Sequence, residues 1–151
     1  MEFLPVTDYE TFHSLMVPYY RDGADADTPQ EELDAFIGYL YGLTQDGTIF
    51  GCVAYEEKPV GICLWWIDVP ELPFSNKPGW GTILEMGLIP EYRGKGMGRK
   101  LADYALSQME VSYAYVCAYG PAEGFWKQCG YEDRGEVASN GLKLLVQEKH
   151  K

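Results

Sequence analysis

The chain has 151 residues, of which 46% are hydrophobic and 15% are aromatic, so a single domain over residues 1–151 with one core is expected. Twelve lysine and arginine residues against 23 aspartate and glutamate residues give a net charge of −11, which argues against general nucleic-acid binding. The N-terminal segment lacks the pattern of a secretory signal, and the longest apolar run, Val60–Ile67, is too short to span a membrane. A cytoplasmic protein without a membrane anchor is the expectation.

The first third of the sequence predicts a strand followed by two helices. Phe3–Val6 is a short strand, and Thr7–Glu10 matches the Ser/Thr-x-x-Glu capping box, which predicts a helix to about Pro18. The same box recurs at Thr28–Glu31, with proline at the first helical position. A second helix to about Gly42 is predicted by four apolar residues at helical spacing, Leu33, Phe36, Ile37 and Leu40.

The middle of the sequence predicts three strands. Thr48–Tyr55 and Val60–Asp68 are rich in aromatic and β-branched residues and predict an antiparallel hairpin in which Cys52 lies opposite Cys63. All four cysteines are expected to be reduced. They show no CxxC spacing, and the chain has only two histidines, which is too few to favour a zinc site. A proline-rich loop follows, and Thr82–Ile89 is a further strand.

The second half alternates helices and strands. Gly87 lies inside the predicted strand, where a glycine often marks a bulge or a close backbone approach. A helix is predicted over Met97–Met109, a strand over Tyr113–Ala118, a short helix over Pro121–Cys129 and a final strand over Leu142–Gln147. The complete order, β-α-α-β-β-β-α-β-α-β-β, indicates a mixed α/β fold around one sheet.

The most informative segment is the glycine-rich loop at residues 90–100, PEYRGKGMGRK, between a predicted strand and a predicted helix. Its three glycines leave the backbone unobstructed, so successive N–H groups at the start of a helix can bind an anion. Neither the G-x-G-x-x-G fingerprint nor the P-loop spacing fits the segment. Four of the twelve basic residues lie here, Arg93, Lys95, Arg99 and Lys100. The loop therefore predicts a polyanionic ligand.

This loop resembles motif A, R/Q-x-x-G-x-G/A, of the GNAT-superfamily N-acetyltransferases, with Arg93, Gly96 and Gly98 at the defining positions. Residues 88–96, LIPEYRGKG, are similar to the family's V-x-P-x-x-R-G-x-G run, and residues 122–131, AEGFWKQCGY, are similar to its A-x-x-F-Y-x-x-x-G-F run. The resemblance implies a GNAT-like α/β (α+β) fold. Its central, mostly antiparallel mixed sheet would splay after the fourth strand, with about four flanking helices, in a single acyl-CoA-binding domain.

The resemblance also implies that acetyl-CoA is the cosubstrate and that no metal takes part. In the family, the loop amides bind the pyrophosphate, and the pantetheine arm pairs with the preceding strand, whose sheet splays near the position of Gly87 to admit the cofactor. The cofactor-binding residues would be Met86, Gly87, Leu88, Arg93, Gly94, Lys95, Gly96, Met97 and Gly98, together with Phe125.

The candidate catalytic residues also come from the resemblance. Glu85 is the candidate base that takes a proton from the amine, and the alternative is a surface carboxylate or one paired with a lysine. Trp126 stands where the family often has a tyrosine that protonates the leaving thiolate. The indole N–H of a tryptophan cannot serve as an acid at neutral pH. Tyr119 is then either a weak candidate acid or a packing residue, and the CoA thiolate can also leave unassisted.

The function implied is transfer of an acetyl group to a primary amine of a small molecule or peptide by direct attack in a ternary complex. Five carboxylates between and within the first two helices suit a cationic amine, or are solvated and capping groups: Asp22, Asp25, Asp27, Glu31 and Glu32. Trp126 motivates an alternative, an acyl-CoA-binding sensor or interaction module with little or no turnover. A third hypothesis is an enzyme that uses a longer acyl-CoA. The resemblance also allows a homodimer.

Overall fold

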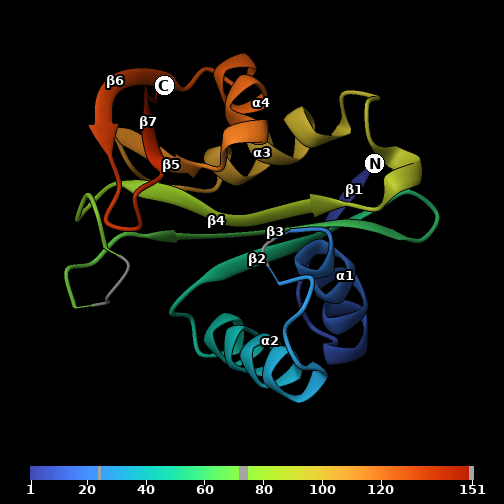
Figure 1. Ribbon diagram of the computed structural model, residues 1–151. Helices are drawn as coiled ribbons and strands as arrows, with labels where there is room; N and C mark the ends of the chain where they lie inside the picture. The colour runs from blue at the N-terminus through green and yellow to red at the C-terminus, as the bar shows by residue number, and fades with distance from the viewer. Residues whose placement is uncertain (24, 72–74, 150–151) are drawn as a thin grey trace. The chain divides into compact units, whose positions relative to one another are not determined.

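The computed structural model describes residues 1–23, 25–71 and 75–149 (Figure 1). Its elements follow the predicted order. In the described part of the chain, the strands are β1 (Glu2–Pro5), β2 (Phe50–Tyr55), β3 (Pro59–Ile67), β4 (Gly81–Leu88), β5 (Tyr113–Ala118), β6 (Glu132–Val137) and β7 (Lys143–Glu148). The α-helices are α1 (Tyr9–Arg21), α2 (Gln30–Gln45), α3 (Met97–Ser107) and α4 (Glu123–Gln128), with short 3-10 helices at Pro90–Tyr92 and Gly120–Ala122.

The strands form a mixed sheet in the order β1-β2-β3-β4-β5-β7-β6. The pairs β1–β2, β5–β7 and β6–β7 are antiparallel, whereas β4 and β5 are parallel. The register pairs of β4 with β5 are Gly81↔Ala114 and Thr82↔Tyr115, at the start of both strands. The predicted mixed, mostly antiparallel sheet is confirmed, and this short parallel pairing agrees with a splay after the fourth strand.

The chain divides into two compact units. Unit 1 comprises residues 1–64 and 85–101, and unit 2 comprises residues 65–84 and 102–151. A single domain over residues 1–151 therefore stays a prediction. None of the helices in the described residues combines the length and the apolar character that a membrane span requires.

In unit 1, α1 and α2 pack against each other and lie on one face of β2 (Figure 1). Phe12 and Met16 of α1 and Ile37 of α2 have no exposed surface. The ring of Phe12 meets that of Tyr41 edge-on, with centroids 5.5 Å apart. These residues recur every three or four positions, so each helix turns one apolar stripe inward.

The first residues of α1 and α2 are capped differently from the prediction. Asp8, and not Thr7, caps α1, because its carboxylate accepts hydrogen bonds from the N–H of Thr11 at 3.2 Å and from the hydroxyl of Thr11 at 2.6 Å. Pro29 stands at the N-cap of α2, which has no side-chain cap. The hydroxyl of Thr28 donates to Asp25 instead, at 3.0 Å. Both predicted capping boxes were therefore wrong.

The first helix is also longer than predicted. It continues through Pro18 to Arg21. Proline lacks an N–H and is unfavourable inside a helix, so ending the helix at Pro18 was a reasonable inference from local sequence. The additional turn carries Tyr19 and Tyr20, and this turn forms part of the candidate site.

In unit 2, the buried carboxylate of Asp68 holds the loop that follows β3. It accepts hydrogen bonds from the N–H groups of Asn76 at 2.8 Å and Lys77 at 2.7 Å, and from the hydroxyl of Tyr115 at 2.6 Å. Tyr115 belongs to the core formed with β7. A single carboxylate thus ties the proline-rich segment to the sheet of unit 2.

The four cysteines are free, as predicted. Burial raises the pKa of Cys52 to about 12, so its thiol is unreactive at neutral pH. Burial also raises the pKa of Cys63, with smaller contributions from Cys52 and Glu85. The pairing of Cys52 opposite Cys63 stays a prediction.

Candidate active site

The glycine-rich loop lies in unit 1, between β4 and α3. Gly94 and Gly96 have φ values of +77° and +79°, a region that residues with a side chain rarely adopt. A Cβ atom at either position would meet nothing within 4 Å. The backbone conformation therefore requires these two glycines, and the space in front of the loop is open.

The backbone amides of this loop are available to a ligand. The N–H of Arg93 donates to the carbonyl of Pro90 at 3.2 Å, and the N–H of Lys100 donates to that of Gly96 at 3.3 Å. Between them, the N–H groups of residues 94–98 donate to none of the other described residues. Because α3 begins at Met97, these groups include the first N–H groups of a helix, where the helix dipole attracts anions.

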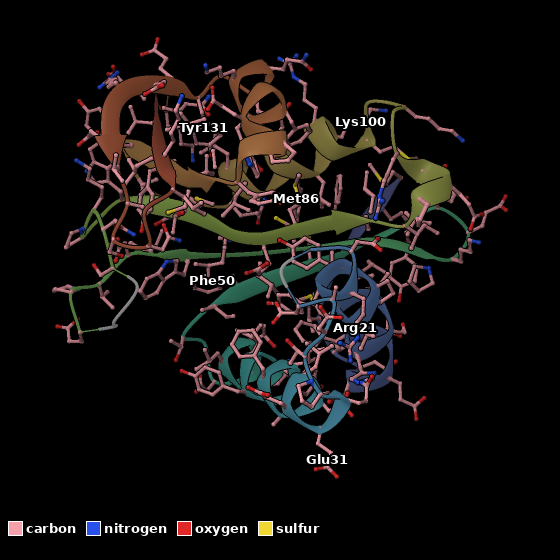
Figure 2. All side chains as sticks on the ribbon, viewed as in Figure 1. Arg21, Glu31, Phe50, Met86, Lys100 and Tyr131 are labelled. Carbon is pink, nitrogen blue, oxygen red and sulfur yellow. The ribbon has the colours of Figure 1, made fainter. Side chains whose placement is uncertain are left out.

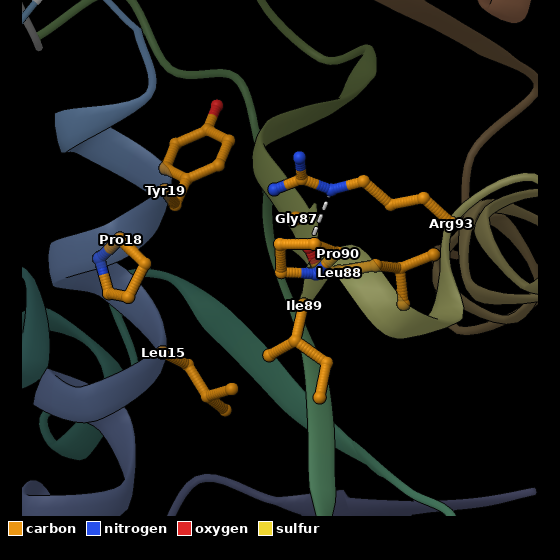
Figure 3. Close-up of a pocket in the computed structure, with 8 residues that line it drawn as sticks. All are labelled: Leu15, Pro18, Tyr19, Gly87, Leu88, Ile89, Pro90 and Arg93. Carbon is orange, nitrogen blue, oxygen red and sulfur yellow. Dashed lines mark hydrogen bonds between the residues drawn. The ribbon is translucent and has the colours of Figure 1, made fainter.

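The side chain of Arg93 turns back from the loop. Its Nε donates to the carbonyl of Leu88 at 2.9 Å (Figure 3), and its Nη2 lies 3.2 Å from the carboxylate of Asp22. The ammonium group of Lys95 lies over the ring of Tyr92, 5.4 Å from its centroid. Arg93 therefore fastens the loop to the end of β4 and to the end of α1.

A small pocket separates α1 from the end of β4 (Figure 3). It is lined by Leu15, Pro18, Tyr19, Gly87, Leu88, Ile89, Pro90 and Arg93. A Cβ atom at Gly87 would lie 2.7 Å from Cδ1 of Tyr19, closer than real atoms approach. A tyrosine ring therefore occupies the space that a side chain at Gly87 would take, and the predicted bulge or close backbone approach stays a prediction.

Glu85 lies two residues before Gly87 in β4, so both residues belong to the same face of the strand. Burial raises the pKa of Glu85 to about 7, although the nearby hydroxyl groups of Tyr19 and Tyr20 lower it, and the charge of Asp25 raises it further. The residue as a whole is half-buried, and its carboxyl group is buried. Glu85 can therefore gain or lose a proton near neutral pH.

Arg21, at the end of α1, organises the segment that joins α1 to α2 (Figure 2). Its Nη1 donates to the carbonyl groups of Asp25 at 2.9 Å, Ala26 at 3.3 Å and Thr28 at 2.6 Å. The N–H of Asp25 donates to the carbonyl of Tyr20 at 3.3 Å. These bonds hold Asp25 beside the last turn of α1.

Unit 1 brings together most of the predicted site residues, namely Glu85, Met86, Gly87, Leu88 and the loop from Arg93 to Gly98. The other two belong to unit 2. Tyr119 is 62% exposed, and the ring of Phe125 meets that of Trp126 edge-on, with centroids 5.0 Å apart. The roles of Tyr119 and Phe125 stay predictions. Among the described residues, no group of three or more His, Cys, Asp or Glu side chains could hold a metal ion.

Tyr19 and Tyr20 were not predicted as site residues, because the first helix was expected to end at Pro18. The sequence did contain a pattern that indicates a longer helix, since Tyr20 continues the apolar series of Phe12 and Met16 at intervals of four residues. Asp25 was singled out as one of several acidic residues, and its effect on Glu85 was not foreseen.

Comparisons with known proteins bear on the family and the fold. The model of the acetyltransferase (GNAT) family matches residues 9–131. A GCN5-related N-acetyltransferase from Ralstonia eutropha is similar in structure, with a TM-score of 0.70, 23% identity and coverage of 91% of this chain and 96% of that chain. A GNAT-family acetyltransferase from Brucella melitensis in complex with acetyl-CoA has a TM-score of 0.68 and 15% identity, covering 99% and 88%.

A third similar structure is the aminoglycoside antibiotic 6′-N-acetyltransferase from Acinetobacter haemolyticus, with a TM-score of 0.70, 12% identity and coverage of 91% of this chain and 95% of that chain. A search of curated protein sequences found no match. The structural similarities show the shared fold, and the family model spans most of the chain. This chain therefore belongs to the GNAT family of N-acetyltransferases, whose acetyl donor is acetyl-CoA.

Proposed function

We propose that this protein, acting as one domain over residues 1–151, transfers the acetyl group of acetyl-CoA to a primary amine of a small molecule or peptide in a ternary complex. The observation that carries the proposal is Glu85, a buried carboxyl group on a half-buried residue, whose pKa is about 7, in the same unit as the open amide-lined loop. A base is most effective when its pKa lies near the working pH. Glu85 therefore suits proton removal at neutral pH.

The donor would be held mainly by backbone. The N–H groups of Gly94 to Gly98 are candidates to bind the pyrophosphate, because they are unpartnered among the described residues and precede or begin α3. The ammonium group of Lys95 adds positive charge. The peptide groups of Met86 to Leu88, at the end of β4, would pair with the pantetheine arm, and Phe125 would pack against the cofactor. Arg93 would contribute by fastening the loop.

Glu85 would prepare the acceptor for attack. A primary amine is mostly protonated at neutral pH, and Glu85 takes its proton, directly or through one water molecule. The nitrogen lone pair then forms a bond to the acetyl carbon as the carbon–sulfur bond breaks, and the nitrogen releases its surplus proton to solvent to give the neutral amide. Acetyl-CoA supplies the acetyl group as a thioester, and its thiolate leaves with the electron pair. Tyr119 or solvent returns a proton to sulfur, since a thiol with a pKa near 8.5 is a tolerable leaving group.

One observation favours a second candidate function. Trp126 stands where the family motif has a tyrosine, and its ring packs edge-on against Phe125 and against Tyr131, whose centroid is 5.7 Å away. A chain that binds acyl-CoA without an efficient acid would serve as a sensor or interaction module. Turnover distinguishes this function from acetyl transfer.

The test combines calorimetry with a thiol-release assay. We expect the wild type to bind acetyl-CoA and to release CoA when primary amines are supplied. Glu85→Gln should bind acetyl-CoA within about twofold of the wild type but lose about 10²- to 10⁴-fold in kcat. The exposed Glu110 offers a matched control, Glu110→Gln, which should behave like the wild type.

Two outcomes would contradict the proposal in different ways. Binding of acetyl-CoA without thiol release for any amine would favour the sensor. Full turnover by Glu85→Gln, with an unchanged pH dependence of kcat/KM near pH 7, would remove Glu85 from its role as base.

A further inference from the structure

We propose that the ring of Tyr19 restricts the donor to acetyl-CoA, because it closes the face of β4 on which the acyl group reacts. This inference rests on the proposed acetyl transfer and specifies its donor, against the alternative of a longer acyl-CoA. It is carried by contacts within unit 1, between the last turn of α1 and the end of β4 (Figure 3).

The proposed mechanism places the acyl group beside Glu85 and Gly87. With the pyrophosphate at the loop and the pantetheine arm along Met86 to Leu88, the thioester lies at the far end of the arm, toward Glu85. The attacking nitrogen must reach both the acyl carbon and the carboxylate of Glu85, the latter directly or through one water molecule. The acyl carbon therefore lies on the face of the strand that carries Glu85, and Gly87 belongs to the same face.

The ring of Tyr19 covers this face at Gly87. A Cβ atom at Gly87 would lie 2.7 Å from Cδ1, 3.4 Å from Cγ and 3.5 Å from Cβ of Tyr19. Figure 3 shows the ring reaching from α1 toward this strand. An acyl group that extends past its first methyl group on this face would collide with the ring.

Little other space remains next to the ring. The pocket between α1 and the end of β4 has a volume of about 10 Å³, which is about the room that one water molecule needs. Its lining is mainly apolar and includes Leu15, Pro18 and Ile89. A methyl group fits a space of this size, whereas each further methylene group must displace packed side chains, which is unfavourable.

Several contacts fix the turn that carries Tyr19. The N–H of Asp22 donates to the carbonyl of Pro18 at 2.9 Å, and the carboxylate of Asp22 lies 3.2 Å from Nη2 of Arg93. The ring of Tyr20 packs edge-on against that of Tyr19, with centroids 5.1 Å apart. The ring of Tyr19 therefore moves aside only with the loss of such contacts, which makes it a wall of the acyl site.

The test compares acetyl-, propanoyl- and butanoyl-CoA as donors to the same primary amine, with release of CoA as the readout. We expect the wild type to use propanoyl-CoA with a kcat/KM about 10- to 200-fold lower than that for acetyl-CoA, the range for one methylene group in an apolar pocket. Tyr19→Ala should bring the values for the three donors to within about threefold of one another. The ratio between donors isolates the acyl site, because a change in the surroundings of Glu85 alters the use of every donor alike.

Three further variants serve as controls. Tyr19→Phe removes the hydroxyl group but keeps the ring, so it should keep the wild-type preference for acetyl-CoA. Tyr39→Ala makes the same truncation as Tyr19→Ala at a position of α2 that is 54% exposed, and it should also keep that preference. Gly87→Ala introduces the Cβ atom that collides with the ring. As a single substitution it should lower the use of acetyl-CoA, and Tyr19→Ala should restore that use in the double variant.

Calorimetric titration gives a readout that does not need turnover. The wild type should bind butanoyl-CoA about tenfold or more weakly than acetyl-CoA, and Tyr19→Ala should bind both alike. CoA itself has no acyl group, so its affinity should be the same for wild type and Tyr19→Ala, which shows that the donor site is still folded. If Tyr19→Ala does not fold, the same ratios are measured with Tyr19→Leu, which shortens the side chain and keeps it apolar.

The outcomes separate the inference from the proposed function. A preference for acetyl-CoA that Tyr19→Ala abolishes and Tyr19→Phe keeps supports the inference. A wild type that uses or binds propanoyl- and butanoyl-CoA as well as acetyl-CoA overturns it, and so does a Tyr19→Ala protein that binds CoA normally but keeps the wild-type preference. Failure to turn over any amine with any donor overturns the proposed function, while the titration still tests the acyl site.

Discussion

The raised pKa of Glu85 makes the stability of this protein depend on pH. The pKa of this group is about 7 in the folded chain, compared with an ordinary value of 4.5. At about 1.36 kcal/mol per pKa unit, the difference corresponds to about 3 kcal/mol. Because the folded state holds the proton more tightly, this contribution is fully present below about pH 4.5 and is lost as the pH rises through about 7.

Glu85→Gln removes this dependence, since glutamine stays neutral at every pH. At about pH 5, the two proteins should differ little in their free energy of unfolding beyond the local effect of the substitution. At about pH 8.5, the variant should have gained up to about 3 kcal/mol relative to the wild type. The expected result is that removing the proposed catalytic carboxylate stabilises the protein as the pH rises.

Urea denaturation, followed by tryptophan fluorescence at several pH values, measures the difference directly. Glu110→Gln, at an exposed position, should show no comparable change with pH. The reasoning is refuted if the free energies of unfolding of wild type and Glu85→Gln run parallel between pH 5 and 8.5. A difference that grows in the opposite direction would mean that the folded chain prefers Glu85 ionised.

Two further predictions concern the cores of the two units. Phe12→Ala should lower the free energy of unfolding by about 3–5 kcal/mol, because the side chain has no exposed surface; a loss below about 1 kcal/mol in urea denaturation would contradict this packing. Asp68→Asn should cost about 1–3 kcal/mol at neutral pH, since hydrogen bonds from Tyr115 and the loop keep the pKa of Asp68 low despite its burial. That stability is present above about pH 4 and is lost as the pH falls, so thermal unfolding temperatures of Asp68→Asn and wild type should converge toward pH 3.

Local sequence was sufficient for much of the fold and for the anion-binding loop. Helical and strand periodicity predicted the order of the elements, because each element buries one face and repeats its apolar residues accordingly. The glycines of the loop were recognisable because three of them within five residues leave the backbone unobstructed, and the structure adds that Gly94 and Gly96 have positive φ values. Local rules also misled, since the capping hydrogen bond of α1 comes from Asp8 and not from Thr7.

The sequence by itself thus determined the loop, the strand that carries Glu85 and the family to which both belong. The tertiary structure decided what surrounds Glu85. Tyr19, Tyr20 and Asp25 precede it by many residues, and they affect it because α1 extends one turn past Pro18 and Arg21 holds the following segment. A pKa depends on burial and on charges acting through space, neither of which is a property of neighbouring residues in the chain. The proton chemistry of Glu85 therefore follows from the folded structure.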